Sequence, residues 1–600
     1  MLFFVIFIFG AVILGAGAML SPAWPTLQPR VGLAGAFSLA IIIGGTIFLA
    51  SLFAWNTLVI DYLLFALVVG IFLGGTLSVG QSRAEKRGET LEDVDQGWPG
   101  PHDLAFFGMI AVALVLLVVL LGVPFGTSAQ GYGFMALVTR DGSTLDTFAP
   151  FHPQIEYLYA PGFSALTAYL SQQLNVSIAS VQFGVGAVLA LLNIWVAYDL
   201  GAEIRNKRLG RMMAVAMLAS LGVIGMLMQG EYTALLGLIF AQAFLAFVVR
   251  WLRYGYAVDA VGAGLMLGAV AISSPGIMIM VLLGYVPWLA IIWLSDPRPT
   301  LRSWVVLAFV IPLIAVAAVS PWLADIVDLL RSGLRSPYER SLDHLRVMLV
   351  YHGVWVVPVA LVGLYFGWLR REPIVMLCIV WLFLMIDFST SGGLAALFPF
   401  ITRYSVPFDI AWHGPVIPFT ILGGMGLLWL WDTVITPRFG DLTYRQVYVI
   451  SGLVTVLAVI GFFIVEPERL SREARLVTED DMAAAEWLRA NAPQDARILN
   501  YPLWGEWTPA LAERDSVFYP VLPYATATTL EEQNALMAFW LDPDNPAHAD
   551  LLAEAGIDYV LIPAENRAML VETESVARAP YLEPVFEQGS AHIYAVIADQ

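Results

Sequence analysis

Three carboxylates and one histidine lie in one polar stretch, residues 127–174, between apolar segments of the chain: Asp141, Asp146, Glu156 and His152. A carboxylate at a membrane surface acts as a general base when partial desolvation raises its pKa. Asp141 and Asp146 are therefore predicted to be catalytic bases. The alternative for Asp141 is a simple turn, because a glycine follows it. His152 and Glu156 flank a tyrosine- and proline-rich segment, where packing or capping is the alternative role.

Two arginines at the ends of apolar runs are suited to a phosphate group. Arg403 lies in the short segment FPFITRYSVP, and Arg346 lies at a span end beside His344. A guanidinium binds a phosphate through two parallel hydrogen bonds. Arg403 and Arg346 are therefore predicted to bind a phosphorylated donor. His152 and Glu156 are predicted to contribute to the same donor site. The alternative is that both arginines extend to the membrane interface without a ligand.

Aromatic and acidic side chains alternate in a later segment, LWGEWTPALAER. Aromatic faces beside a carboxylate suit the binding of a sugar. Trp504, Glu506 and Trp507 are therefore predicted to bind an acceptor. The alternative is a packed pair of tryptophans that anchors a domain.

The elements that must position these residues are mostly membrane helices. The chain has 600 residues, of which 59% are hydrophobic and 13% are charged, whereas soluble proteins have about 25% charged residues. Apolar runs long enough to cross a bilayer recur through the first three quarters of the chain. We predict about fourteen spans, which begin near residues 1, 31, 58, 104, 177, 211, 232, 257, 276, 303, 347, 373, 409 and 447.

Several classes of function lack a sequence signal. The sequence has no P-loop and no G-x-G-x-x-G motif that opens a helix, so nothing indicates an ATP-driven pump or a nucleotide-binding domain. The single cysteine, Cys378, excludes an intrachain disulfide, and no zinc-type spacing occurs. The acidic C-terminal region argues against nucleic acid as a partner, because phosphate contacts require lysine and arginine.

Residues 466–600 are predicted to form a separate acidic domain. They hold 24 acidic and 8 basic residues, a net charge of −16 out of −18 for the whole chain. TEDDMAAAEWLRANAP, which begins at Thr478, predicts an amphipathic helix with an acidic first turn. ARILNYP, YVLIP and AHIYAVI predict strands. The expected fold class is a polytopic α-helical membrane protein with a small C-terminal α/β domain.

Lysines and arginines of the connecting segments indicate the orientation of the spans. Basic residues concentrate in the connectors after the third, fifth, seventh, ninth, eleventh and thirteenth predicted spans, so that side is predicted to be cytoplasmic. The N-terminus, the polar stretch and the C-terminal domain then lie outside the cytoplasm, in a plasma (inner) membrane protein. The connector at residues 321–346 is an exception, because it carries four arginines on the outer side.

The pattern resembles the GT-C superfamily of membrane glycosyltransferases. APFHPQIEYLYAPGFSALTAYL resembles the Tyr–Pro–Pro–Gly segment that opens the second juxtamembrane helix in that superfamily, and AAAEWLRANAPQDARIL and AGIDYVLIP resemble the external domains of its bacterial and archaeal members. The resemblance covers residues 104–600. It implies a GT-C-like transmembrane domain at 104–465, with a large external loop at 126–176, and an extracytoplasmic domain at 466–600. Residues 1–103 are an addition of three helices and a cytoplasmic loop.

The resemblance also implies an activity. It implies transfer of a hexose or pentose from a polyprenyl-phosphate carrier to an extracytoplasmic glycan, lipid or protein, as in dolichyl-phosphate-mannose mannosyltransferases and oligosaccharyltransferases. The lipid-linked sugar is then the donor, and membrane lipids and the acceptor are the partners. The loop acids permit a divalent metal ion without requiring one.

One departure from the family pattern leaves alternatives open. The family usually carries an Asp or Glu shortly after the span that enters the loop, whereas this chain has GTSAQGYGF there, and its nearest acids are Asp141 and Asp146. Either the catalytic acid has moved, or the chain is a non-catalytic GT-C-like subunit of a membrane assembly with other subunits. A transporter or flippase of a lipid-linked substrate is the other alternative. Against it, the sequence has no inverted internal repeat and few ionisable residues at span centres.

Overall fold

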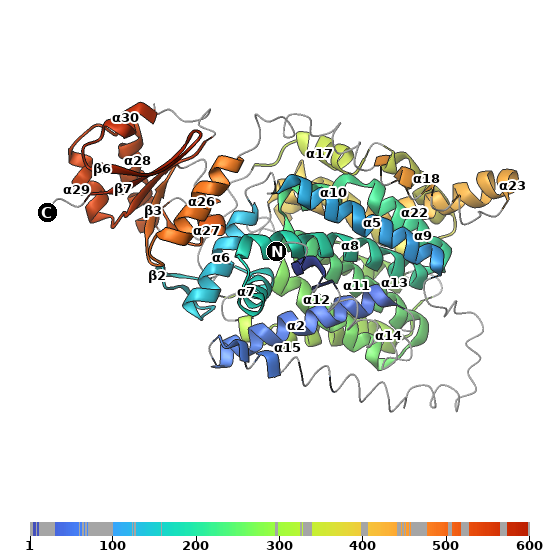
Figure 1. Ribbon diagram of the computed structural model, residues 1–600. Helices are drawn as coiled ribbons and strands as arrows, with labels where there is room; N and C mark the ends of the chain where they lie inside the picture. Colours follow the sequence, from blue (N-terminus) through green and yellow to red (C-terminus); the bar gives the residue numbers. More distant parts are fainter. Residues whose placement is uncertain are drawn as a thin grey trace.

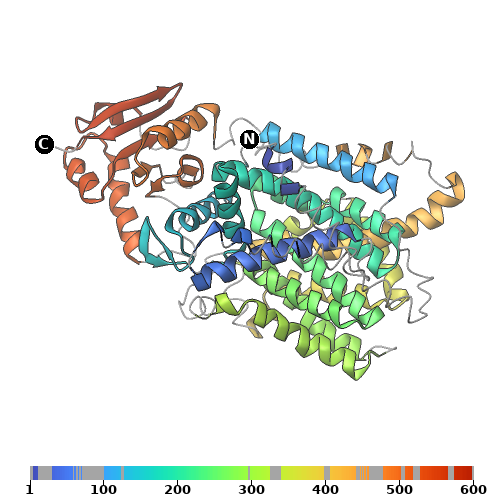
Figure 2. The same cartoon turned by 60° about the horizontal axis from the view of Figure 1, so that its bottom comes forward.

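The computed structural model describes most of the chain. It leaves out residues 1–3, 8, 11–29, 54, 59, 63–64, 66–68, 70–99, 123, 125–127, 158, 295–297, 324–326, 328–338, 354, 398–405, 441–445, 447–448, 451, 455, 458–476, 502–506, 518–526, 565–572 and 598–600. In the described part, a bundle of helices adjoins a smaller domain built on a five-stranded sheet (Figure 1). The segment that contains α6 and α7 lies between the two (Figure 2).

The bundle contains long helices and several short ones. In chain order they are α2 (Val31–Phe53), α5 (Pro101–Leu121), α6 (Ser128–Gly142), α7 (Gly162–Leu174), α8 (Ile178–Ile204), α9 (Lys207–Ala219), α10 (Leu221–Gln229), α11 (Tyr232–Tyr254), α12 (Ala257–Ser273), α13 (Pro275–Leu294), α14 (Leu301–Val305), η1 (Val306–Val310), α15 (Ile311–Ala318), η2 (Ser320–Trp322), α17 (Asp343–Tyr351), α18 (Val356–Leu369), α19 (Pro373–Ser389), η3 (Ala395–Leu397), α21 (Pro407–His413), α22 (Val416–Leu430), η4 (Trp431–Ile435) and α23 (Thr436–Phe439). A two-stranded hairpin, β1 (Thr147–Phe148) and β2 (His152–Glu156), lies between α6 and α7.

The described residues contain six helices that are long and apolar enough to cross a membrane, or eight if each of two bent helix pairs is one span. The protein is therefore a multi-pass membrane protein, as predicted. Three further apolar helices are shorter, at Val31–Ile47, Ala257–Ser273 and Pro373–Ser389. The predicted spans near residues 1, 58 and 447 lie largely outside the described residues, so the count of about fourteen stays a prediction.

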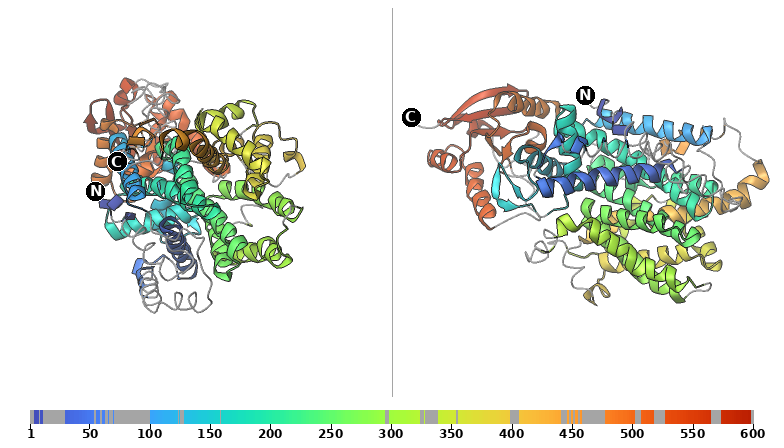
Figure 3. Two further views of the ribbon diagram at one scale, coloured as in Figure 1. Left: turned by 90° about the vertical axis from the view of Figure 1, so that its right-hand side faces the viewer. Right: turned by 90° about the horizontal axis from the view of Figure 1, so that it is seen from below.

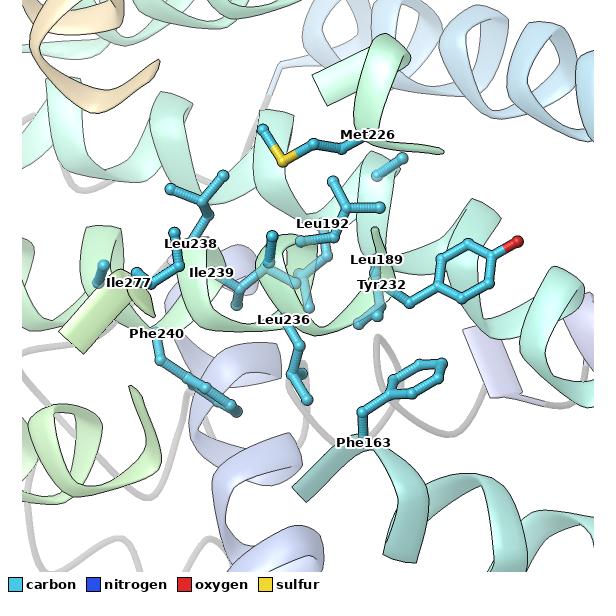
Figure 4. Close-up of a cluster of buried hydrophobic side chains, with 14 of the residues drawn as sticks. Phe163, Leu189, Leu192, Met226, Tyr232, Leu236, Leu238, Ile239, Phe240 and Ile277 are labelled. Carbon is cyan, nitrogen blue, oxygen red and sulfur yellow. The ribbon is translucent and has the colours of Figure 1, made fainter. Parts of the chain in front are cut away.

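The centre of the bundle is formed by α8 and α11. Both helices are apolar around their whole circumference and buried along most of their length, as expected for helices surrounded by other helices. Figure 4 shows Phe163 of α7 beside Tyr232 of α11, and their ring centroids are 5.5 Å apart. The aromatic pair fixes the start of α7 against the membrane core.

Close approach of helix backbones is possible where glycines face each other. At Gly363 of α18 an added Cβ would collide with the carbonyl oxygen of Leu422, and at Gly426 of α22 it would collide with that of Val359. Small residues at such contacts allow van der Waals packing between membrane helices, which lack a strong hydrophobic drive to associate.

A buried ion network holds α2 to the bundle at the end remote from the small domain. Glu203 Oε1 of α8 lies 2.7 Å from the Arg30 Nε and 2.7 Å from the Arg250 Nη1, and Arg250 Nε lies 3.0 Å from Asp259 Oδ1. All four side chains are less than 5% exposed. Asp199 Oδ2 also accepts the Leu33 N–H at 2.9 Å. The network therefore joins the start of α2 to α8, α11 and α12. Each of its four charged side chains has an oppositely charged partner.

The C-terminal domain contains α26 (Glu479–Asn491), β3 (Arg497–Asn500), α27 (Trp507–Ala512), β4 (Asp515–Ser516), α28 (Ala527–Leu541), α29 (Ala547–Glu554), β5 (Tyr559–Ile562), α30 (Thr573–Arg578), β6 (Leu582–Gln588) and β7 (Ala591–Val596). The strand order is β4-β3-β5-β7-β6, parallel from β4 to β5 and antiparallel beyond. The predicted strands at β3, β5 and β7 are confirmed. So is the predicted helix α26, whose N-cap Thr478 and Asp481 form a capping box.

The polar stretch contains more structure than the sequence indicated. The expected large external loop at 126–176 begins with a helix, because α6 occupies the first third of the polar stretch. Three glycines in SAQGYGFMALVTRDG lower the helix propensity of this segment. A buried face that includes Phe134, Met135 and Val138 outweighs that cost. The same face packs on Phe148 and Ile155 of the hairpin, so α6, β1 and β2 form one small core.

The buried network gives a stability prediction. Arg250→Met leaves two buried carboxylates, Glu203 and Asp259, without their shared cation. Breaking such a pair costs about 3–5 kcal/mol, and we expect this loss in the free energy of unfolding, measured by denaturant titration in detergent micelles. Arg208→Met is the matched control, because Arg208 pairs with Asp432 at 49% and 44% side-chain exposure and should cost about 0–1 kcal/mol. Equal effects of the two changes would contradict a stabilising role for the network.

Candidate functional site

Two carboxylates begin helices at the same end of the bundle. Glu231 is the residue before α11, and Asp409 lies in the first turn of α21. Both are partly exposed, and they interact electrostatically with each other. Gly230 ends α10 at a φ of +78°, and an added Cβ there would lie 2.7 Å from the Ala129 Cβ. Only glycine therefore allows the turn that presents Glu231 beside the start of α6.

Two tyrosines from the polar stretch face these carboxylates. The rings of Tyr132 and Tyr159 lie 6.1 Å apart, and both hydroxyls interact with Thr233 of α11. Burial raises the pKa of Tyr159 to about 12, and the charges of Glu231 and Asp409 add to the rise. The pKa of Tyr132 is also raised, by burial first and then by Tyr159 and Glu231. Both phenols therefore remain hydrogen-bond donors at neutral pH.

This arrangement can perform acid–base chemistry on a hydroxyl group. A carboxylate removes a proton, while phenol groups donate hydrogen bonds to substrate oxygens. We call Glu231, Asp409, Tyr132 and Tyr159 the carboxylate–tyrosine cluster.

The helix α17 lies beside the cluster. His344 of α17 packs edge-on against Phe408, with ring centroids 6.0 Å apart, and Phe408 directly precedes Asp409. His344 Nδ1 also lies 2.9 Å from the Ser389 carbonyl oxygen. Arg346 is on the same helix and is exposed. The predicted phosphate ligand Arg346 is thus on an element that packs next to Asp409.

The predicted base Asp141 lies elsewhere, at the contact between α6 and the C-terminal domain. Arg140 Nε donates to Asp141 Oδ1 at 2.7 Å, and Arg140 Nη1 donates to Glu513 Oε2 at 2.9 Å. Burial alone would lower the pKa of Arg140, but hydrogen bonds and charge from Asp141 and Glu513 raise it instead. Glu513 also accepts the Ile178 N–H at 2.9 Å. Asp141 is therefore part of an ion-paired contact.

His152 belongs to the same contact between domains. Its Nε2 lies 3.0 Å from the Asp515 Oδ1, and both residues are 4% exposed. Asp515 is also 3.4 Å from Arg497, which binds Glu532 at 2.7 Å. His152 thus joins the hairpin to the edge strand β4 of the C-terminal sheet.

Two cavities adjoin this contact. One, of about 700 Å³, is lined by the predicted residues Asp141 and His152 and by Arg497, Asp515 and Glu532 of the C-terminal domain, among others. The other, of about 730 Å³, lies on the α7 side of Asp141. The C-terminal domain therefore covers the polar stretch without filling the space between them.

The remaining predicted site residues do not join either group. Asp146 is exposed, and its carbonyl oxygen accepts the Tyr157 N–H at 2.9 Å. Glu156 ends β2 and Trp507 begins α27, but their side chains lie outside the described part of the structure. Arg403, Trp504 and Glu506 lie wholly outside the described residues.

The sequence contained a signal for Glu231 and Asp409 that was not used. Each is an acid next to the start of an apolar run, in a connector predicted to lie outside. Neither is among the predicted bases, which both lie in residues 127–174. In the part of the chain that the structure describes, no group of three or more His, Cys, Asp or Glu residues could hold a metal ion.

Comparisons with known proteins agree with this geometry at the level of the fold. No protein-family model matches the sequence, and no curated protein matches it. Solved structures do match: the Archaeoglobus fulgidus oligosaccharyltransferase (14% identity, TM-score 0.51, 81% of this chain and 73% of that one), ArnT from Cupriavidus metallidurans bound to undecaprenyl phosphate (13%, 0.54, 82% and 97%), and the arabinofuranosyltransferase AftD from Mycobacteria (16%, 0.52, 82% and 42%). These are GT-C membrane glycosyltransferases, so the resemblance seen in the sequence is confirmed for the fold.

The contact between α6 and the C-terminal domain gives a second stability prediction. Glu513→Gln keeps an acceptor for the Ile178 N–H but removes the charge that pairs with Arg140, and we expect a cost of about 1–3 kcal/mol. Glu513→Leu removes both interactions and should cost about 1–3 kcal/mol more. Denaturant titration of both variants measures the difference. The control is Glu486→Gln, because the Glu486 side chain is 76% exposed. If Glu513→Leu lowers the free energy of unfolding no more than Glu513→Gln does, the contact with the Ile178 N–H contributes nothing.

Proposed function

We propose that this chain, which has the fold of GT-C membrane glycosyltransferases, is itself a membrane glycosyltransferase. It transfers a sugar from a polyprenyl-phosphate carrier to a glycan, lipid or protein acceptor. The observation that supports this most directly is the carboxylate–tyrosine cluster, because it combines a base and hydrogen-bond donors at one end of the membrane helices. Neighbouring carboxylates beside hydrogen-bond donors are a common feature of acid–base sites.

The reaction that fits the cluster is a displacement at the anomeric carbon of the donor sugar. Glu231 takes the proton of an acceptor hydroxyl, because it interacts with both Tyr132 and Tyr159. The acceptor oxygen then bonds to the anomeric carbon. The bond from that carbon to the carrier phosphate breaks, and the phosphate leaves with the electron pair. Arg346 of α17 supplies a cation for the leaving phosphate, and Arg403 keeps the same predicted role.

The carrier and the side of the membrane follow from separate observations. ArnT, which shares the fold, was solved with undecaprenyl phosphate bound, and a carrier of that class suits a reaction at the end of apolar helices. The distribution of lysines and arginines favours an N-terminus and a C-terminal domain outside the cytoplasm, in the cell envelope. We retain the domain limits 1–103, 104–465 and 466–600 as part of the proposal.

A transfer assay with the full chain in liposomes tests the proposal. The substrates are a panel of labelled polyprenyl-phosphate sugars, and the readout is label released from the carrier. Glu231→Gln should reduce the rate by about 10²- to 10⁴-fold, because loss of general-base catalysis has effects of that size. Asp409→Asn should also lower the rate. Asp432→Asn is the matched control, because Asp432 forms an exposed pair with Arg208, and its rate should equal that of the wild type.

Asp141→Asn and Asp146→Asn belong in the same assay, since these acids were predicted from the sequence. A rate that falls in either of these variants while Glu231→Gln stays active would move the base into the polar stretch. Wild-type protein that cleaves no donor of the panel would contradict the enzymatic proposal. That result would favour the non-catalytic subunit or the transporter of lipid-linked substrate.

A further inference from the structure

Two residues that follow α2, Trp55 and Asp61, form hydrogen bonds with the polar stretch. Trp55 binds both of its helices at their ends. The Trp55 Nε1–H donates to the Gln172 Oε1 in the last turn of α7 at 2.7 Å. The Trp55 backbone N–H donates to the carbonyl oxygen of Ser143, the residue after α6, at 3.1 Å. The Trp55 side chain is buried, so these bonds form away from competing water.

Asp61 binds α7 through both of its carboxylate oxygens. Its Oδ1 accepts the hydroxyl of Tyr169 at 2.7 Å, and its Oδ2 accepts the side-chain amide of Gln173 at 2.8 Å. Hydrogen bonds to an ionised acceptor are stronger than neutral ones. We call Trp55 and Asp61 the N-terminal clamp.

We propose that the N-terminal clamp positions Tyr132 and Tyr159 for the transfer reaction, so that Trp55 and Asp61 are positioning residues that act through α6 and α7. The inference rests on the proposed function. It extends that function to residues 1–103, which the resemblance to GT-C glycosyltransferases does not cover.

Helix geometry connects the clamp to the tyrosines. Tyr132 lies in the second turn of α6, ten residues before Gly142 at its end, which is about 15 Å at 1.5 Å per residue. Tyr159 lies three residues before α7 begins at Gly162. The two helices also pack against each other. Each tyrosine is therefore at the start of a short helix whose other end is held by the clamp.

Apolar packing fixes the start of α7 but not its last turn. At the start, Phe163 packs against Tyr232 of α11, with ring centroids 5.5 Å apart. In the last turn, Gln172 and Gln173 are exposed. Two fixed points are needed to define the direction of a rigid helix, and the hydrogen bonds of the clamp supply the second.

The clamp has its own anchor in the membrane helices. Helix α2 has 23 residues, about 34 Å, and it packs on α7 and α8. At its first end, Arg30 Nε lies 2.7 Å from Glu203 Oε1 in the buried ion network. The right-hand view of Figure 3 shows α2, in blue, with one end beside the cyan α6–α7 segment. The clamp therefore holds the polar stretch against the bundle independently of the C-terminal domain.

The end of α6 has a conformation that needs such support. Ser143 has a φ of +53°, in the left-handed region that is unfavourable for residues other than glycine. Such a conformation persists where surrounding contacts hold it, and the bond from the Trp55 N–H to the Ser143 carbonyl oxygen is one of these contacts.

Fluorine NMR of the full chain in lipid nanodiscs tests the positioning without any substrate. 3-Fluorotyrosine replaces Tyr159 and reports its surroundings. Asp61→Leu removes both acceptors of the clamp, and Trp55→Phe removes the ring N–H while keeping an aromatic ring. Both changes should shift or split the resonance. Asp61→Asn should keep the wild-type resonance, because an amide accepts from Tyr169 and donates to the Gln173 amide oxygen.

The transfer assay on the same variants shows whether position affects the reaction. Asp61→Leu and Trp55→Phe should lower kcat about ten- to a hundredfold, because small misplacements of reacting groups have effects of that size. The donor KM should stay within about twofold, since the clamp acts on the chemical step. Asp61→Asn should retain kcat within about twofold of the wild type.

Two controls separate positioning from a general loss of structure. Tyr62→Phe changes a neighbouring side chain that is 74% exposed, and both its resonance and its kcat should equal those of the wild type. Arg250→Met lowers the stability of the bundle without touching the clamp, and the resonance of its folded form should stay in place.

The proposal is overturned if Asp61→Leu and Trp55→Phe keep the wild-type resonance or the wild-type kcat. It is also overturned if Arg250→Met changes the resonance as they do, or if Asp61→Asn is as impaired as Asp61→Leu. Normal clamp variants of a chain that cleaves donor remove the clamp and leave the proposed function standing. A wild type that cleaves no donor contradicts the proposed function, whereas a resonance that moves only in the clamp variants still supports control of Tyr159 by the clamp.

Discussion

One carboxylate, Glu513, joins three parts of the protein. It binds Arg140 at the end of α6, it accepts the first N–H of α8 at Ile178, and it belongs to the C-terminal domain. A charge that enters a partly buried site must be paired, because the desolvation of an unpaired ion is costly. Arg140 and the positive end of α8 supply that pairing. The need to neutralise the charge of Glu513 therefore joins the polar stretch, the membrane helix α8 and the C-terminal domain.

Helix geometry extends this constraint to the carboxylate–tyrosine cluster. Because α6 is fixed at Asp141 by the ion pairs and along its buried face by the hairpin, its first turns must project toward the start of α11. Glu231 and Asp409 each lie at a helix N-terminus, where the aligned backbone dipoles stabilise negative charge.

Sequence patterns predicted the parts of the fold that depend on local composition. Helices α8, α11 and α13 follow from long apolar runs, and β5 follows from a buried strand pattern that ends at a proline. The sequence does not predict helix α6, because its glycines lower the helix propensity and its apolar face is buried only by contacts with later segments. Arg140 and Glu513 are 373 residues apart, and Glu231 is likewise distant from Asp409, so no spacing rule could pair them.

The missing acid after α5 has a physical interpretation in this fold. A base is defined by the place where it meets the substrate, and not by the connector that carries it. Tyr132 follows α5 at the position where the loop enters, and it interacts with Glu231 from the next outer connector. In the proposed reaction, Glu231, which directly precedes α11, takes the role of an acid on the first loop. Apolar packing fixes where the helices end, and it leaves open which helix end carries the acid.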